Sequence, residues 1–271
     1  MDRRSAPSLH NPCEISIVIP AYDEELRLGP TLDRILDFIQ RQEWSAEIIV
    51  VDGCSQDRTA DLVRAYAEAH PIVHLLQIPS NRGKGYCVRQ GMLNASGSII
   101  LFSDADLSSP IEESLHLISA LNAGADIAIG SRWLRSELQT RRQSVSRQGM
   151  GRLFNLLLRL TLGLNFKDTQ CGFKAFRRNA AHAIFPLQKI ERWGFDPEIL
   201  FLARQAGFTV AEVPVRWAHD CRSRINPIAD GLRMAKEVLA VRCFYLNGKY
   251  VNHGQPTAPI SASATQQTSA E

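Results

Sequence analysis

Residues 98–106, SIILFSDAD, decide the fold. The first half of this stretch is a run of strand-forming apolar residues, and the second half ends in two carboxylates one residue apart, Asp104 and Asp106. Open α/β sheets bind their ligands at the carboxyl edge of such strands. Two neighbouring carboxylates repel each other unless a cation lies between them, and Mg²⁺ or Mn²⁺ bridging a diphosphate would serve. The pattern predicts a divalent metal held by Asp104 and Asp106, although Asp-x-Asp alone also arises by chance.

Strand-like and helix-like segments alternate around this stretch. Strands alternating with helices at this spacing predict a parallel sheet with right-handed crossovers. The continuous apolar runs SIVI, IIVV and IILF are typical of strands covered on both faces. The sequence therefore predicts an α/β fold with a mostly parallel central sheet. The expected strands are residues 14–20, 46–51, 73–77, 98–103 and 125–130, and the helices between them are 32–42, 59–69, 85–95 and 111–123.

Beyond residue 130 the pattern changes. We expect one domain over residues 13–250, with a nucleotide-binding half up to 130 and an acceptor half from 131. A polar N-terminus (1–12) and a low-complexity tail (251–271) are both expected to be disordered. The acceptor half is predicted to contain an Arg-rich stretch, an apolar helix at 152–164, a segment at 168–176, an amphipathic helix at 197–206, a strand at 210–214 and a basic helix at 228–245.

The bulk composition excludes several classes of protein. The net charge of the 271 residues is only +3, so nothing global predicts nucleic-acid binding. The six cysteines form no CxxC pair, which indicates reduced thiols. No apolar run approaches the ~20 residues of a membrane span, and the N-terminus lacks the apolar core of a signal peptide. We expect a cytoplasmic protein, soluble or peripheral on a membrane.

Polar clusters close three of the predicted strands. They are PAYDE at residues 20–24, DGCSQD at 52–57 and DAD at 104–106. Because parallel strands end at the same edge of a sheet, these clusters are expected to line one crevice. Each cluster alone is also explained as a turn or helix cap, since Ser55 and Asp57 are good capping residues. Three clusters on one edge favour a binding site.

A glycine-rich loop, NRGKG at residues 81–85, precedes a predicted helix. Glycines let backbone N–H groups approach a phosphate, the helix N-terminus favours anions, and Arg82 or Lys84 adds positive charge. The loop matches neither the P-loop nor the GxGxxG pattern, and a plain glycine turn remains the alternative.

Seven motifs follow one another along the chain: IVIPAYDEE, VVDGCSQD, NRGKGYCVRQGM, LFSDADLSSP, IGSRW, DTQCGFKAF and ERWGFDPEILFLA. In this order they resemble the motifs of family-2 glycosyltransferases with the GT-A fold, over about residues 14–245. The last two motifs resemble the polyprenyl-phosphate branch, nearest to dolichyl-phosphate β-glucosyltransferases and then to dolichyl-phosphate mannose synthases. This resemblance implies a nucleotide-sugar donor, a divalent metal (Mg²⁺ or Mn²⁺), a polyprenyl-phosphate acceptor and inversion at the anomeric carbon.

The resemblance also assigns roles to individual residues. Asp104 and Asp106 resemble the ribose and metal ligands. Two departures stand out: Gly53-Cys54 replaces the commoner Asp-Gly of DDGS, and Ser108 stands where mannose synthases carry Gln. The residues implied to seat the nucleotide are Pro20, Tyr22, Glu24 and the base-contacting Asp52, joined by Lys84 from the glycine loop, and those implied to hold the acceptor phosphate are Arg132, Arg142 and Ser146.

The chemistry of the acceptor decides which catalytic groups are needed. A phosphate monoester is already anionic at pH 7, so no strong base is required and Arg suits it through its planar fork. Six Arg and one acid lie between residues 132 and 152, where the alternative is a solvated charged face. If the acceptor were a hydroxyl, Asp196 or Glu198 would be the base candidates, with helix capping as the alternative. The predicted catalytic residues are Asp106, Asp196 and Arg132.

The apolar segment at residues 151–164 is too short to span a membrane. It suits a core helix, or a helix at a membrane surface with Arg152 and Arg159 at the headgroups, and the resemblance favours the membrane. The basic last helix is expected either to share this role or to pack on the sheet.

The sequence thus predicts an inverting, metal-dependent enzyme that moves glucose from UDP-glucose onto a polyprenyl phosphate. Two alternatives keep the enzyme class: a soluble sugar, glycerate or glycan acceptor, or GDP-mannose as the donor. A third is a catalytically inactive nucleotide-sugar-binding scaffold, against which the intact Asp-x-Asp argues.

Overall fold

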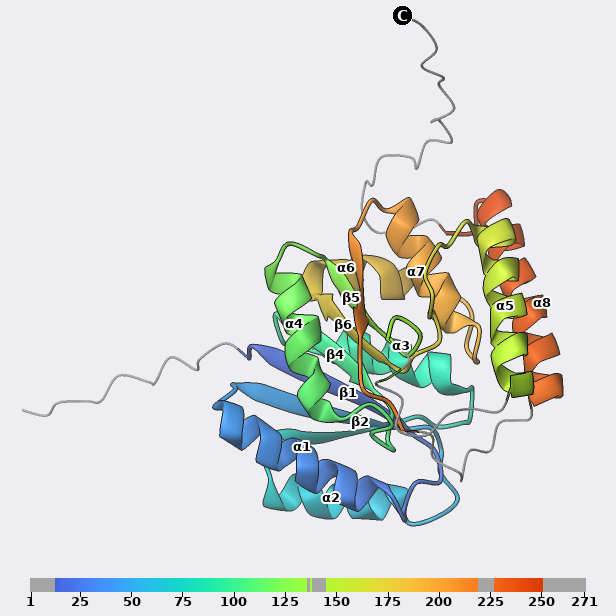
Figure 1. The fold of residues 1–271 in the computed structure, drawn as a ribbon. Helices are drawn as coiled ribbons and strands as arrows, with labels where there is room; N and C mark the ends of the chain where they lie inside the picture. Colours follow the sequence, from blue (N-terminus) through green and yellow to red (C-terminus); the bar gives the residue numbers. More distant parts are fainter. Residues whose placement is uncertain (1–12, 136, 138–144, 219–226, 251–271) are drawn as a thin grey trace, which may run out of the picture.

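The computed structural model describes residues 13–135, 137, 145–218 and 227–250. The expectations for residues 1–12 and 251–271 lie outside this part of the chain. One seven-stranded sheet, in the order β3-β2-β1-β4-β6-β5-β7, forms the centre of the molecule (Figure 1). Its strands are β1 (Ile15–Ala21), β2 (Ala46–Asp52), β3 (Val73–Gln77), β4 (Ile99–Ser103), β5 (Ile127–Ser131), β6 (Phe173–Arg177) and β7 (Val210–Pro214).

The sheet is mostly parallel, as predicted. β1 pairs in parallel with β2 and β4, β2 with β3, and β5 with β7. The exception is β6, which runs antiparallel to both β4 and β5. In this pairing Phe173, the first residue of β6, lies opposite Ser103, the last residue of β4. The reversal therefore brings the segment before β6 to the edge of the sheet where β4 ends.

Eight α-helices surround the sheet in the described part of the chain. Helix α2 and strands β3 and β7 have the predicted bounds, whereas α5 begins at Val145 rather than at residue 152. The short helix α6 was not predicted; its apolar residues Ala180, Ala181 and Ile184 pack into the core. The helices are α1 (Leu28–Gln42), α2 (Thr59–Ala69), α3 (Lys84–Asn94), α4 (Ser114–Asn122), α5 (Val145–Leu162), α6 (Arg178–Ile184), α7 (Phe195–Gln205) and α8 (Pro227–Leu246).

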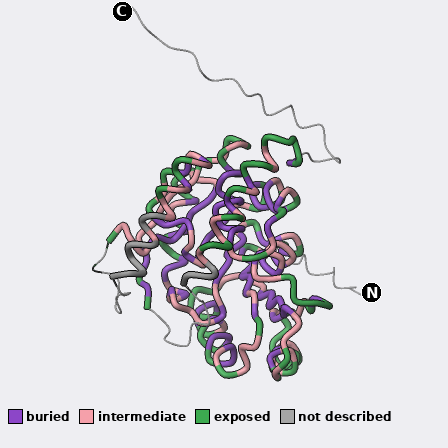
Figure 2. Tube along the Cα trace, turned by 90° about the vertical axis from the view of Figure 1, so that its right-hand side faces the viewer, coloured by how far each residue is buried: buried purple, intermediate pink, exposed green. Residues whose placement is uncertain are grey.

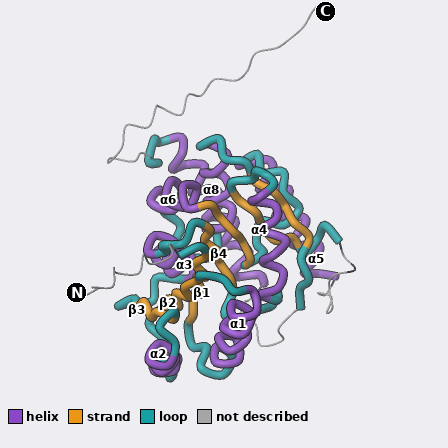
Figure 3. The backbone as a smooth tube through the Cα atoms, turned by 90° about the vertical axis from the view of Figure 1, so that its left-hand side faces the viewer, coloured by secondary structure: helices purple, strands orange, loops and turns teal. Residues whose placement is uncertain are grey.

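The two faces of the sheet have separate apolar cores. Helices surround the strands in Figure 3, and Figure 2 marks which parts of the backbone are buried. Ile15, Ile17 and Ile19 of β1 point to the face covered by α1, α2 and α4. Val18 of β1 points to the opposite face, which is covered by α3, α6 and α7, with α5 and α8 also packing against that core. Alternate residues of a strand point to opposite faces, so a strand buried on both sides needs a continuous apolar run.

Helices α5 and α8 lie side by side at the outside of the second face (Figure 1). Each buries one side: Leu158 and Leu162 of α5, and Val238 and Val241 of α8, belong to the core. No helix in the described ranges is long and apolar enough to cross a bilayer.

Gly91 sets how closely α3 packs on the sheet. A Cβ atom at this position would lie 2.3 Å from Val18 Cγ1 and 2.9 Å from Val51 Cγ2. We expect Gly91→Ala to lower the free energy of unfolding by about 1–3 kcal/mol, the usual cost of overpacking a core, in urea titrations. Gly231→Ala in α8 is the control, because a Cβ there meets nothing within 4 Å. Equal stability of the two variants would contradict this packing.

Candidate active site

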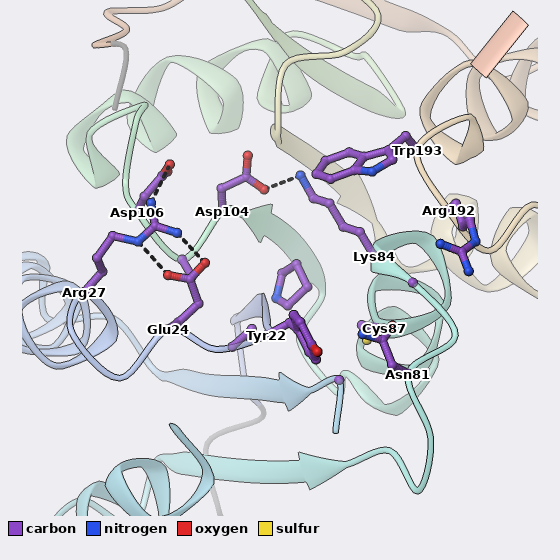
Figure 4. A pocket seen from close by; sticks show the side chains of 15 residues that line it. Tyr22, Glu24, Arg27, Asn81, Lys84, Cys87, Asp104, Asp106, Arg192 and Trp193 are labelled. Atoms are coloured by element: carbon purple, nitrogen blue, oxygen red, sulfur yellow. Dashed lines mark hydrogen bonds and ion pairs between the residues drawn. The ribbon is translucent and has the colours of Figure 1, made fainter. Parts of the chain in front are cut away.

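A cavity of about 470 Å³ opens where β1, β2 and β4 end (Figure 4). The start of α3 and the segment before α7 complete its walls. The cavity therefore lies at the edge of the sheet where the three polar clusters were predicted to meet. The lining residues are Pro20, Ala21, Tyr22, Glu24, Arg27, Gly53, Asn81, Gly83, Lys84, Cys87, Asp104, Ala105, Asp106, Arg192 and Trp193.

Asp104 and Asp106 meet cations in this pocket. The Lys84 Nζ lies 2.5 Å from Asp104 Oδ1, and an Arg27 Nη lies 3.9 Å from Asp106 Oδ2. Burial disfavours the charge of Lys84, but the surrounding carboxylates, led by Asp104, raise its pKa, so it is a cation at neutral pH. Ser108 N–H donates to Asp106 Oδ1 at 2.9 Å and fixes the turn. The charged residues that line the pocket are thus three acids and three basic residues: Glu24, Asp104, Asp106, Arg27, Lys84 and Arg192.

The loop after β1 is held by the loop after β2. Asp23 N–H donates to Ser55 Oγ, and Glu24 N–H donates to Thr59 Oγ1. Asp57 accepts from Thr59 N–H at 2.9 Å. Ser55 and Asp57 thus stabilise the turn after β2 and hold the backbone of Asp23 and Glu25, although α2 has no side-chain cap bond. Neither residue lines the cavity.

Asp52 lies behind the pocket wall. Its carboxylate is buried and accepts from Ser55 N–H, while its neighbour Gly53 lines the cavity. Cys54, at the position where DDGS has Gly, has a positive φ of 67°. Left-handed backbone costs a non-glycine residue roughly 1–2 kcal/mol, so this departure from the family pattern leaves some strain in the loop.

The two cations of the glycine loop have different partners. Lys84 points into the pocket, whereas Arg82 pairs with Glu191 and stacks on Tyr86. A Cβ at Gly85 would lie 2.8 Å from the carbonyl oxygen of Arg192. The glycine at 85 is therefore required for contact with the segment before α7, and Lys84 is the loop's cation that lines the pocket.

Two carboxylates give a divalent cation an incomplete set of ligands. Among the described residues, no group of three or more His, Cys, Asp or Glu side chains is arranged to hold a metal. Mg²⁺ usually takes one or two carboxylates and completes its shell with substrate phosphates and water. Asp104 and Asp106 fit that kind of site, in which the metal binds together with a phosphate ligand.

Comparison with known proteins identifies the family. The model of the family described as Glycosyl transferase family 2 matches residues 16–185. This chain belongs to glycosyl transferase family 2. It is a glycosyltransferase, as the sequence motifs predicted.

Curated relatives and solved structures agree with this assignment. A protein of Trichomonas vaginalis, dolichyl-phosphate beta-glucosyltransferase ALG5C, is 35% identical over 94% of this chain and 79% of its own length. A dolichyl-phosphate beta-glucosyltransferase of Dictyostelium discoideum is 36% identical, covering 86% and 75%. Glucosyl-3-phosphoglycerate synthase from Mycobacterium tuberculosis, solved with Mn²⁺, UDP-glucose and phosphoglyceric acid, superposes with a TM-score of 0.63 at 21% identity, over 85% of this chain and 79% of its own. The fold is therefore GT-A.

The glycosyltransferase also buries an ion pair, whose carboxylate interacts with Lys84 of the pocket. Lys174 of β6 is fully buried and its Nζ lies 2.5 Å from Asp196 Oδ1 and 2.5 Å from the Cys171 carbonyl oxygen. Burial raises the pKa of Asp196, although Lys174 and Lys84 oppose the shift. Asp196 does not line the pocket. Its predicted catalytic role stays a prediction, and the geometry assigns it a structural partner.

Glu198 is also committed elsewhere. It is fully buried and accepts from Lys189 N–H, Ile190 N–H and the Tyr250 hydroxyl, at 2.7–2.9 Å. Burial raises its pKa to about 7. It does not line the pocket either, so a role as base for a sugar hydroxyl finds no support in this geometry.

Removing one member of the buried pair is expected to destabilise the enzyme strongly. Lys174→Met leaves Asp196 buried without its cation, which typically costs about 3–5 kcal/mol. We expect the double variant Lys174→Met/Asp196→Leu to recover most of this loss, since neither charge is then buried. Urea unfolding of both variants checks the coupling. A double variant no more stable than the single one would contradict it.

Arg132 directly follows β5 and has a carboxylate partner. Its guanidinium donates to both oxygens of buried Asp168, at 2.6 and 2.8 Å, and its carbon is 5.4 Å from the centre of the Trp217 ring. It does not line the described pocket. Arg142 lies outside the described residues, and Ser146 is on α5 with its side chain undescribed. The acceptor-phosphate roles of these three residues therefore stay predictions.

Four lining residues were not singled out from the sequence. Arg27 donates to the carboxylate of Glu24. The two residues are three positions apart, so the sequence did contain the signal for this pair. Arg192 and Trp193 belong to the motif ERWGFDPE, but only the fold brings them over α3. Burial raises the pKa of the Cys87 thiol to about 11, so this cysteine lines the pocket as a neutral thiol.

Proposed function

We propose that this glycosyltransferase moves a hexose, with glucose from UDP-glucose favoured, onto a polyprenyl phosphate such as dolichyl phosphate. Support for the acceptor comes from the relatives named dolichyl-phosphate beta-glucosyltransferase, which are 35% and 36% identical over most of the chain. The observation that carries the proposal is the pocket itself, where Asp104 lies beside Lys84 and Asp106 beside Arg27 at the carboxyl edge of the sheet.

The donor is expected to bind with its diphosphate among these charges. Lys84 and Arg192 supply positive charge for the phosphate oxygens, and the loops of Tyr22 and Gly53 leave room for the nucleoside. Asp104 and Asp106 would hold Mg²⁺ or Mn²⁺, which, when bound, neutralises charge on the leaving diphosphate. A structurally similar enzyme was solved with Mn²⁺ and UDP-glucose. A second hollow nearby is lined by four acids (Asp23, Glu24, Glu25 and Asp57), so it suits a diphosphate less well.

The transfer needs little acid–base chemistry from the protein. An oxygen of the acceptor phosphate attacks the anomeric carbon from the face opposite the diphosphate, the bond to the diphosphate breaks, and the configuration inverts. Because the attacking oxygen is already anionic, no proton has to be removed. This agrees with the structural partners of Asp196 and Glu198. Arg132, Arg142 and Ser146 are proposed to hold the acceptor phosphate beside the donor.

A peripheral position on the cytoplasmic face of a membrane is part of the proposal. The α5–α8 pair exposes leucines beside basic side chains, a combination that favours an anionic lipid surface. Leu232, Leu239 and Leu246 recur at intervals of seven along α8, which places them on one side of the helix. The exposed leucines are Leu156, Leu160, Leu232, Leu239 and Leu246, and the exposed basic residues beside them include Arg159, Lys236, Arg242 and Lys249.

A donor screen tests the reaction. UDP-glucose, UDP-GlcNAc, UDP-galactose and GDP-mannose, each labelled in the sugar, are incubated with Mg²⁺ or Mn²⁺ and a short polyprenyl phosphate. We expect label in the organic phase from UDP-glucose, and its loss in Arg142→Ala. If label appeared from GDP-mannose alone, the donor would be GDP-mannose and not UDP-glucose. If sugar were transferred only to a sugar, glycerate or glycan in the aqueous phase, the assignment of a lipid acceptor would be wrong.

Liposome sedimentation tests the membrane position separately. The enzyme is expected to sediment with vesicles that contain anionic lipid, and Leu232→Ser/Leu239→Ser is expected to remain in the supernatant. Equal partitioning of both proteins would contradict a role for this face of α8.

A further inference from the structure

The segment 188–194 carries Arg192 and Trp193 to the pocket as an irregular connection between the turn after α6 and the start of α7. In Figure 4, Trp193 lies beside Lys84, and Arg192 stands at the opposite end of the Lys84 side chain. The Lys84 Nζ is 5.2 Å from the centre of the Trp193 ring. Both side chains project from backbone outside regular secondary structure, so their positions depend on what holds that backbone.

The first half of the segment is fixed from α3 and α7. Glu198 accepts from the N–H groups of Lys189 and Ile190. The amide of Gln188 donates to the carbonyl oxygens of Gly85 and Ile190, both at 2.8 Å. Tyr86 N–H donates to the Glu191 carbonyl oxygen at 3.0 Å. These bonds end just before Arg192.

A side chain of α8 also holds the second half of the segment, where Gly194 leads into α7 and its carbonyl oxygen accepts from Glu198 N–H at 3.4 Å. Glu237 Oε2 accepts from Gly194 N–H at 2.7 Å. A Cβ at Gly194 would lie 2.7 Å from both Glu237 Cβ and Glu237 Oε2, so the absence of a side chain there lets the carboxylate reach the backbone. Burial raises the pKa of Glu237, while the Gly194 N–H and the nearby Arg192 and Arg233 oppose this shift. Without Glu237, Gly194 N–H would lose its hydrogen bond, and the residues that enter the pocket would be held only by the bonds before Arg192 and by the start of α7.

We propose that Glu237 is a positioning residue, which clamps Gly194 through its hydrogen bond and thereby holds Arg192 and Trp193 in place for an anionic nucleotide diphosphate. Its effect on donor use rests on the proposed function, whereas the clamp itself does not. The proposal also gives α8 a role at the pocket in addition to its contact with the core.

Three substitutions separate the hydrogen bond from the charge. Glu237→Gln keeps an acceptor oxygen at the same reach but loses the charge. Glu237→Asp keeps the charge but is one methylene too short for Gly194. Glu237→Ala removes both, and Glu68→Ala, an exposed glutamate of α2, is the control. If the alanine variant fails to fold, the comparison of the Gln variant with the Asp variant still shows whether the hydrogen bond or the charge of Glu237 holds Gly194.

Amide hydrogen exchange across residues 188–194 is the primary measurement, because it needs no substrate. A hydrogen bond to a carboxylate shifts a local opening equilibrium by roughly tenfold or more. We expect about tenfold faster exchange at Gly194 and its neighbours in the Asp and Ala variants, and near-native exchange in the Gln and control variants. Native exchange in the Asp variant together with fast exchange in the Gln variant would overturn the proposal, as would native exchange in all four.

Kinetics then test the consequence for the donor. We expect Glu237→Asp to raise KM for the nucleotide sugar by about tenfold with little change in kcat, while Glu237→Gln stays within a few-fold of the wild type. A native KM in the Asp variant would show that the clamp does not serve the donor. If the wild type transfers none of the tested sugars, the proposed function fails, and the exchange data still decide whether Glu237 clamps the segment.

Discussion

Asp106→Asn is expected to reduce sugar transfer by on the order of 10³-fold while the enzyme keeps its fold. Asp106 lines the pocket, and the Asn amide oxygen still accepts from Ser108 N–H, so the turn survives. What disappears is the negative charge that a divalent cation and the diphosphate require, and losses of this size follow when one charge-stabilising group is removed. The measurement is kcat and KM for donor and acceptor, with the melting temperature as the check on folding.

Asp37→Asn is the matched control, because Asp37 is an exposed acid of α1 paired with Arg41. It should retain wild-type activity. An Asp106→Asn enzyme with more than a tenth of wild-type kcat would contradict the assignment. A wild-type protein that binds the nucleotide sugar but never cleaves it would instead favour the scaffold alternative.

Gly172→Ala should have nearly as large an effect without touching a charged residue. A Cβ at position 172 would lie 2.0–2.6 Å from the carboxylate atoms of Asp104. Since Asp104 N–H donates to the Gly172 carbonyl oxygen, the two residues cannot simply move apart. Asp104 must turn away and lose Lys84. We expect kcat/KM to fall by roughly 10²-fold or more, as misplacement by about 1 Å costs that much.

Gly231→Ala, which meets nothing within 4 Å, is the control for adding a methyl group. The readouts are the steady-state constants together with Mn²⁺ affinity, which should weaken in Gly172→Ala alone. Wild-type metal affinity and activity in Gly172→Ala would show that the carboxylate of Asp104 has another working position.

The sequence predicted the half of the site that short-range patterns determine. Apolar runs that end in acids located β1, β2 and β4, and the parallel pairing brought Glu24, Lys84, Asp104 and Asp106 to one pocket. These predictions succeed because strands buried on both faces pair in parallel, and parallel strands all end at the same edge of the sheet. The glycine loop was also placed correctly, although Gly85 proves to serve packing against Arg192.

The rest of the site depends on long-range placement. Nothing in FKAFR shows that β6 runs antiparallel in the middle of the sheet, and this reversal alone brings Gly172 to Asp104 and Lys174 to Asp196. Asp196 and Glu198 look like base candidates in the sequence because two acids flank a proline. Only the fold shows that their oxygens are occupied by Lys174 and by backbone N–H groups.

The most direct test of this account is a crystal structure of the enzyme with UDP and Mn²⁺. The account predicts density in the pocket at the ends of β1, β2 and β4, with the metal between the diphosphate and the carboxylates of Asp104 and Asp106, and Lys84 on a phosphate oxygen. Nucleotide density in the second hollow beside Asp23 and Asp57, or a metal without contact to either Asp104 or Asp106, would contradict it.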